Sequence, residues 1–143
     1  MQRYRAIKAL QQGKKMNVPD DRKYSETHEW YLVDGDIVTV GITQHAADEL
    51  TDITFVDLPA TDAVVSGDSP IGEVESVKAT SEIFSCLGGQ VIETNTKLAD
   101  HPELINDDAF ERGWLVKIKA DSLEPLESLL DAKGYREFLA ASV

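Results

Sequence analysis

The sequence predicts a mainly β fold with short helices, and three observations support this prediction. Residues 37–42 are rich in β-branched side chains, which favour strands. Residues 114–119 follow a period of two, as does a strand with one buried face. Strand-like runs do not alternate with long helices, and we find no glycine-rich phosphate loop, which argues against an α/β nucleotide-binding fold.

The first half of the chain contains a predicted hairpin and then a helix. Asp34-Gly35 stands between two apolar runs and is a strong turn signal, so we expect residues 30–33 and 37–42 to pair. Thr43 has a suitable side chain for the N-cap of a short helix over residues 44–50.

Further strand segments follow, and then a polar stretch. Residues 53–58 read as a strand that Pro59 ends, since proline cannot donate to a sheet ladder. Val64-Val65 leads into a turn at residues 66–68. Residues 97–112 are polar, and we expect them to be irregular.

The C-terminal end is predicted to be helical. Ser122 precedes Pro125, and proline is tolerated in a first helical turn. Leu126, Leu129 and Leu130 have helical spacing. Gly134 is expected to end that run before a second short apolar face, made of Tyr135, Phe138 and Leu139.

The charge is strongly acidic and unevenly distributed. The net charge is −12, from 14 Lys and Arg against 26 Asp and Glu. Residues 1–16 hold five basic residues and no acidic one, so the remaining chain carries −17, which is −12 less the +5 of this segment. Such a surface repels phosphates, which argues against nucleic-acid binding. It steers instead toward basic patches on partner proteins.

The length of 143 residues fits one domain, which we place at residues 17–143. Residues 1–16 are predicted to be a basic, disordered N-terminal extension without the apolar segment of a secretory signal. We find no run of the ~20 apolar residues that cross a bilayer. We expect a cytoplasmic location, or the mitochondrial matrix if the extension is a presequence.

Cysteine and histidine usage argues against disulfide and metal sites. Cys86 is the sole cysteine, so an internal disulfide is excluded and a cysteine-based zinc site is implausible. We expect a buried thiol that is not a nucleophile, because no activating base is near it in the sequence. The histidines have no metal-ligand spacing, so we predict no metal. We expect His45 and His101 to be isolated, and His28 to be a hydrogen-bonded structural residue near Glu29.

Lys78 stands midway between two glycines, with Gly67 eleven residues before it and Gly89 eleven residues after it. Two equal arms folded at their midpoint place Lys78 at a hairpin tip. Val77-Lys78-Ala79 is poor turn chemistry, and a local rule broken at a tip indicates function. An exposed lysine can form an amide with a carboxylate cofactor, giving a swinging arm. A solvated surface lysine is the alternative.

The segment from Glu75 to Ser81, followed by Gly89, resembles the lipoyl attachment region of the glycine cleavage system H protein family. The resemblance covers residues 23–139 through an ordered set of matching segments, at residues 23–24, 27–30, 40–43, 55–59, 103–106 and 113–119.

The resemblance implies a lipoyl-domain-like flattened barrel or sandwich of two antiparallel sheets, with a short internal helix and C-terminal helices. It also implies a carrier that is not itself an enzyme. Lipoate, covalently bound through Lys78, would accept the aminomethyl group of glycine from the P protein, which is glycine decarboxylase. It would deliver this group to the T protein, an aminomethyltransferase, and be reoxidised by the L protein.

The resemblance also assigns roles to particular residues. Glu75, Val77 and Ala79 belong to the attachment motif that lipoylating enzymes read. Glu29 and Glu82 are expected in a cleft near the loaded arm, with a solvated acid as the alternative for each. Two further side chains, those of Trp30 and Trp114, are expected in the core.

Two departures from the family pattern and three alternative functions remain open. Cys86-Leu87-Gly88 replaces a more usual proline-containing segment, and Thr51-Asp52 replaces the commoner Gly-Asp, which predicts a different turn.

A biotinyl-type carrier is one alternative function, although Val77 and Ala79 stand where such carriers show methionines. The others are an H-like relay of octanoyl or lipoyl groups for protein lipoylation, and a β interaction module with an unmodified lysine.

Overall fold

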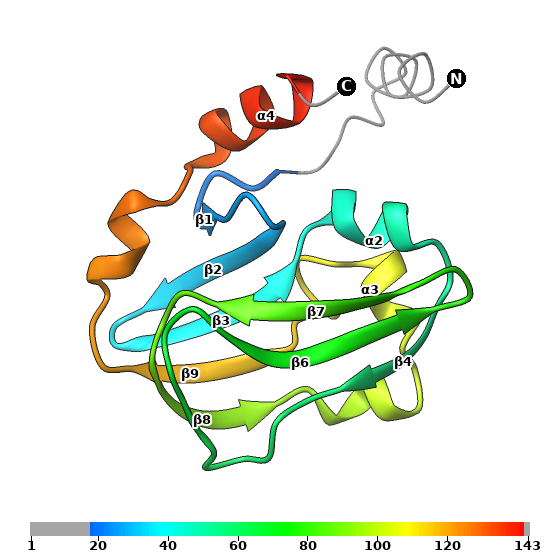
Figure 1. Ribbon diagram of the computed structural model, residues 1–143, viewed down its shortest axis with the longest axis horizontal. Coiled ribbons are helices and arrows are strands. Elements are labelled where there is room, and N and C mark those ends of the chain that lie inside the picture. The colour runs from blue at the N-terminus through cyan, green and yellow to red at the C-terminus, as the bar shows by residue number, and fades with distance from the viewer. Residues whose placement is uncertain (1–17, 142–143) are drawn as a thin grey trace.

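The computed structural model describes residues 18–141. They form two antiparallel sheets with short helices at one end and a C-terminal helix along one edge (Figure 1). The predicted fold class is therefore confirmed. The predicted extension over residues 1–16 lies outside the described residues. Across residues 18–141, no helix is long and apolar enough to cross a membrane.

The two sheets share the described strands unequally. The larger sheet has six strands in the order β1-β2-β3-β9-β8-β5, which are β1 (Lys23–Tyr24), β2 (Glu29–Asp34), β3 (Ile37–Ile42), β9 (Val116–Ala120), β8 (Gly89–Thr94) and β5 (Val64–Val65). The smaller sheet has the order β4-β6-β7, which are β4 (Ile53–Asp57), β6 (Ser69–Ser76) and β7 (Thr80–Ser85). The β6–β7 hairpin runs out to the right of Figure 1, toward α2 (Gln44–Leu50).

The predicted first hairpin and its following helix are both confirmed. β2 and β3 pair from Glu29↔Ile42 to Asp34↔Ile37, and Gly35 in the turn has φ +68°. Glycine suits this turn because it adopts positive φ without a steric penalty. The Thr43 hydroxyl accepts a hydrogen bond from the Ala46 amide at 3.2 Å and so caps α2.

The stretch expected to be irregular contains two short helices. η1 (Thr96–Ala99) buries Leu98, and α3 (Leu104–Asp107) buries Ile105. Each is a single turn of four residues, which is too short to show a helical period in the sequence. Burial of one apolar side chain per turn in the main core stabilises them.

The C-terminal end differs from its prediction. η2 (Glu124–Ser128) ends before Leu129, and α4 (Ala132–Ala141) then runs through Gly134. The break lies at Leu130 instead, whose backbone pairs with Tyr24 by hydrogen bonds of 2.8 and 2.9 Å. The Asp131 carboxylate accepts from the Gly134 amide at 2.8 Å. This N-terminal cap stabilises the first turn of α4 and outweighs the low helix propensity of glycine.

The apolar side chains form two clusters. The main core lies between the sheets and contains Val40, Val74 and Ile118, all fully buried. A second cluster lies under α4 and contains Trp30 and Tyr135. The indole of Trp30 donates to the carbonyls of Ile42 and Ala109 at 2.9 and 3.1 Å, which confirms its place in the core. Trp114 is only half-buried against this cluster.

Candidate functional site

The β6–β7 loop places Lys78 at the tip of a hairpin, as the spacing predicts. The Ser76 hydroxyl accepts hydrogen bonds from the amides of Lys78 and Ala79 at 3.1 and 3.0 Å. The Ser76 amide donates to the Ala79 carbonyl at 2.8 Å. None of the three loop residues, Val77, Lys78 and Ala79, has positive φ. A serine side chain therefore supplies the turn chemistry that Val77-Lys78-Ala79 lacks.

The amine of Lys78 is exposed and has a neutral partner. Its Nζ donates to the backbone carbonyl of Glu49 at 2.9 Å, at the C-terminal end of α2. Among the described residues, Lys78 takes part in no ion pair. A single exposed hydrogen bond of this kind is readily exchanged for water, so the amine is available for reaction.

The loop after α2 contacts the hairpin tip through a backbone hydrogen bond. The Val77 amide donates to the Asp52 carbonyl at 3.1 Å. The preceding residue, Thr51, has φ +61° and ψ −143°, a conformation that essentially only glycine adopts freely. The Asn106 side chain fixes this loop, since it donates to the Thr51 carbonyl at 2.6 Å and accepts from the Ile53 amide at 3.0 Å. The strained backbone is consistent with the different turn predicted for Thr51-Asp52.

Thr51→Gly should therefore raise the stability of the protein by about 1 kcal/mol, because glycine removes the strain of a β-branched residue at positive φ. The measurement is the midpoint of chemical or thermal unfolding. Thr54→Gly, at an exposed position of β4 with ordinary φ, is the control and should lower stability by roughly 0.5–1 kcal/mol. A Thr51→Gly protein no more stable than its parent would refute the strain.

A cleft of about 160 Å³ opens beside the tip, between the end of α2 and β7. Its lining includes Thr27, His28, His45, Glu49, Ser81 and Ile83. Glu49 borders the cleft and also holds Lys78 Nζ through its carbonyl. The cleft therefore lies within reach of a group attached to Lys78.

Glu29 is buried behind this cleft. It is 2% exposed, and its Oε1 accepts from the hydroxyls of Ser25 and Thr27 at 2.5 and 2.6 Å. Its Oε2 accepts from the Phe84 amide of β7 at 3.2 Å. Glu29 thus joins β2 to β7 and orients Thr27, which lines the cleft.

Glu82 lies elsewhere, because side chains alternate along β7. Glu82 is exposed on the outer face of the smaller sheet. The cleft is lined by its neighbour Ser81. Glu82 pairs with Glu73, and Glu73 pairs with Asp57, so three carboxylates form one row across the sheet. The structure therefore separates Glu29 from Glu82.

Two histidines meet at the cleft, and the expectation of an isolated His45 was wrong. The ring centroids of His28 and His45 are 4.7 Å apart. Burial, with a smaller effect of His45, lowers the pKa of His28 below its ordinary value, so this ring is neutral at pH 7. The expected hydrogen bond of His28 is present, to the Tyr135 hydroxyl at 2.7 Å. His28 and His45 lie 17 positions apart in the sequence, a spacing that gave no sign that their rings would meet.

Other reactive or concave features lie apart from the tip. Cys86 is half-buried, and burial raises the pKa of its thiol, so it is not poised as a nucleophile. Within residues 18–141, no cluster of three His, Cys, Asp or Glu side chains could hold a metal ion.

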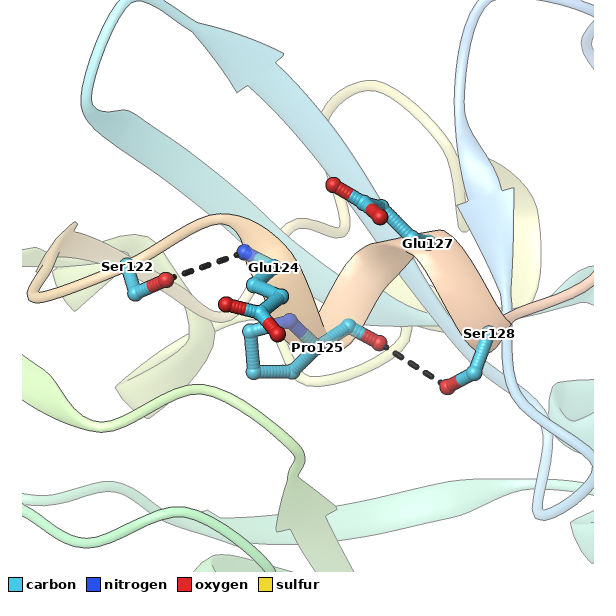
Figure 2. A pocket seen from close by; sticks show the side chains of 5 residues that line it. All are labelled: Ser122, Glu124, Pro125, Glu127 and Ser128. Carbon is cyan, nitrogen blue, oxygen red and sulfur yellow. Dashed lines mark hydrogen bonds between the residues drawn. The ribbon is translucent and has the colours of Figure 1, made fainter.

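A larger depression of about 580 Å³ lies along η2. In Figure 1, η2 is the orange turn on the side away from the tip. Figure 2 shows that the residues lining it come from one turn, where the Ser122 hydroxyl accepts from the Glu124 amide and the Ser128 hydroxyl donates to the Pro125 carbonyl. The side chains of Glu124 and Glu127 extend on different sides of the ribbon and do not converge on a ligand.

Several residues at the cleft were missed by sequence reasoning. Thr27, His45, Glu49 and Ser81 were not predicted there. The spacing of His45 and Glu49 places them on one face of α2, which is a usable signal. The position of Ser81 follows from strand alternation once the tip is fixed at Lys78.

An exposed lysine on a hairpin tip, two sheets around a main core and an adjoining cleft are the features of a carrier domain, the class of protein that bears its cargo on a surface lysine. The sequence model of the glycine cleavage H-protein family matches residues 22–142. The chain therefore belongs to the glycine cleavage H-protein family, the lipoyl-bearing aminomethyl carriers, which are non-catalytic components of the glycine cleavage system.

Individual relatives agree with this assignment. The chain is 44% identical over 124 residues to the "Glycine cleavage system H protein" of Methylacidiphilum infernorum, covering 87% of this chain and 97% of the relative. It is 47% identical over 122 residues to "Glycine cleavage system H protein 3, mitochondrial" of Arabidopsis thaliana, covering 85% and 74%. The crystal structure of a glycine cleavage system H protein from Mycobacterium marinum superposes with a TM-score of 0.77 at 35% identity, covering 87% and 98%.

Proposed function

We propose that Lys78 carries the lipoyl group, and that the chain shuttles the aminomethyl group of glycine from the P protein to the T protein and is reoxidised by the L protein. The observation that carries this proposal is the exposed Lys78 amine at the hairpin tip, held by a neutral carbonyl. The cleft lies beside the tip, within reach of an acyl chain attached there.

The attachment motif is accessible to lipoylating enzymes. Val77 is 70% exposed, and Ala79 is exposed on the other side of Lys78. Glu75 is half-buried near the end of β6, opposite Thr80. Val77 and Ala79 flank Lys78 in a turn fixed by Ser76, so an enzyme can read the shape of the tip together with Glu75.

The chain's own residues prepare a site for the cargo. When bound, lipoate supplies a disulfide that accepts the aminomethyl group and carries it between active sites. Thr27, Ser81 and Glu49 line a cleft in which a cationic amine finds oxygen acceptors and less contact with water. Glu29 acts on this cleft through Thr27, because its carboxylate accepts a hydrogen bond from the Thr27 hydroxyl.

We assign Glu82 to partner docking. The row formed by Asp57, Glu73 and Glu82 lies on the same sheet as the tip, and Lys78 is the only basic residue among residues 51–96. Like charges directly opposite each other on a sheet are destabilising. A basic partner surface compensates them and is attracted to the tip. Phe55, which is 53% exposed, adds apolar contact area beside the row.

Neutralising the row, with Asp57→Asn, Glu73→Gln and Glu82→Gln together, should raise the KM of a partner enzyme for this carrier by about 3-fold or more at low salt, because electrostatic steering is lost. The difference should shrink as salt is added. The control neutralises three acids away from the tip, with Glu124→Gln, Glu127→Gln and Glu137→Gln. Equal KM changes in both triple variants would show that only total charge matters.

The main proposal is tested by the intact mass of the protein made in a host that lipoylates proteins, followed by reconstitution with P, T and L proteins. We expect a lipoyl adduct on Lys78 and glycine-dependent ammonia release. An adduct without ammonia release would favour the octanoyl or lipoyl relay, a biotin mass would favour the biotinyl carrier, and an unmodified lysine would favour the interaction module.

We propose a cytoplasmic location, since a reducing compartment suits the unpaired thiol of Cys86.

A further inference from the structure

Tyr135 of α4 contacts the wall of the cleft through its hydroxyl. The oxygen lies 2.7 Å from His28 Nδ1 and 2.7 Å from Thr43 Oγ1. Tyr135 is fully buried, and its ring stacks on Tyr24 with centroids 4.8 Å apart. The C-terminal helix, the segment before β2 and the N-cap of α2 therefore meet at one hydroxyl.

The protons of these contacts have one consistent direction. The Thr43 hydroxyl oxygen already accepts from the Ala46 amide at 3.2 Å, so its own proton is free to donate to the Tyr135 oxygen. The Tyr135 hydroxyl then donates to His28 Nδ1, which leaves the imidazole proton on Nε2. If the Tyr135 hydroxyl donated to Thr43 instead, the Thr43 hydroxyl proton would have no acceptor within this set of contacts. Burial raises the pKa of Tyr135 and lowers that of His28, so the hydroxyl stays protonated and the imidazole stays neutral.

The backbone also fixes this ring in place. His28 has φ +72°, which is uncommon for a residue with a side chain. Its amide donates to the Ser25 carbonyl at 3.1 Å, and its carbonyl accepts from the Thr43 amide at 2.9 Å. A strained position held from both sides is typical of a functional site.

We propose that Tyr135 is a positioning residue for the carrier: its hydroxyl holds His28 at the cleft wall as the neutral Nε2–H tautomer. This inference rests on the proposed function of the cleft. A protonated ring beside a cationic amine would repel it, whereas a neutral ring presents one N–H donor without net charge. The other groups near His28 are His45 and Glu49 of α2, and Phe138 of α4.

The first test uses the unmodified protein and ring-nitrogen NMR. We expect a protonated Nε2 and an unprotonated, hydrogen-bonded Nδ1 for His28 at pH 7. In Tyr135→Phe, which retains the ring stacking, the Nδ1 resonance should move because it loses its donor. A protonated Nδ1 in the parent protein, or an unmoved Nδ1 resonance in the variant, would overturn the assignment. This readout does not need lipoate, so it separates this inference from the proposed function.

The second test measures how long the lipoylated protein retains the aminomethyl group. Tyr135→Phe should shorten retention by roughly 2- to 10-fold, the effect of one hydrogen bond. Thr43→Val should shorten retention at least as much, because it also removes the cap of α2, whereas Thr43→Ser keeps the hydroxyl and should show parental retention. Leu139→Ala loosens the packing of α4 without touching the hydroxyl and serves as the control. Equal retention in Tyr135→Phe and its parent, or equal losses in Tyr135→Phe and Leu139→Ala, would show that Tyr135 has only a structural role.

Discussion

Lys78→Arg should abolish lipoylation and all carrier activity while leaving the fold intact. A guanidinium keeps the positive charge but does not form the amide that an amine forms. Because the side chain is exposed and its Nζ contact is a single hydrogen bond to the Glu49 carbonyl, thermal unfolding should be unchanged. Intact mass and glycine-dependent ammonia release measure the two losses.

The matched control for this substitution is Lys119→Arg, at an exposed position of β9 in the other sheet. It should be lipoylated and active like the parent. Retained activity in Lys78→Arg would place the attachment elsewhere. A loss accompanied by a lower unfolding temperature would mean that the tip also contributes to stability, contrary to its exposure.

Gly89→Ala should be the most destabilising of the substitutions considered, by about 3 kcal/mol or more. Gly89 has φ +154°, and a Cβ atom there would overlap the Lys119 carbonyl oxygen. That carbonyl belongs to β9, which is paired on both sides, by β3 and β8, and cannot move away. The midpoint of thermal unfolding should fall by roughly 10 °C.

Gly35→Ala is the control for this second result. Gly35 also has positive φ, +68°, but a Cβ atom there would have no heavy atom within 4 Å. Its loss should be limited to the backbone strain of a left-handed residue, about 1 kcal/mol. Similar losses at the two glycines would show that backbone strain, and not the overlap with Lys119, accounts for the effect at Gly89.

Local signals in the sequence predicted the parts of the fold that depend on local chemistry. The Asp34-Gly35 turn and the Thr43 cap each act within a few residues and were predicted correctly. The equal spacing of Gly67 and Gly89 around Lys78 located the tip, because the two strands of the hairpin follow each other directly in the sequence. Gly134 was misread because its helix propensity was considered without the Asp131 cap three residues earlier.

The cleft could be predicted only in part, because its residues come from distant segments. His28 meets His45 and Tyr135 across 17 and 107 positions, through packing that the sequence pattern does not encode. Glu29 and Glu82 were both expected near the arm on family resemblance. Glu29 is buried behind Thr27, whereas strand alternation along β7 places Glu82 on the exposed outer face of the smaller sheet. Polar contacts of this kind need the assembled sheets.

The proposed acylation of Lys78 would change the contact between its amine and the end of α2. Before acylation, the ammonium is attracted to a helix terminus whose free carbonyls carry partial negative charge. Acylation turns the ammonium into a neutral amide and removes that attraction. On the proposed attachment, the reaction that installs the prosthetic group would thus also weaken the hold of the helix end on the side chain, and the tether would gain mobility when it acquires its cargo-bearing group.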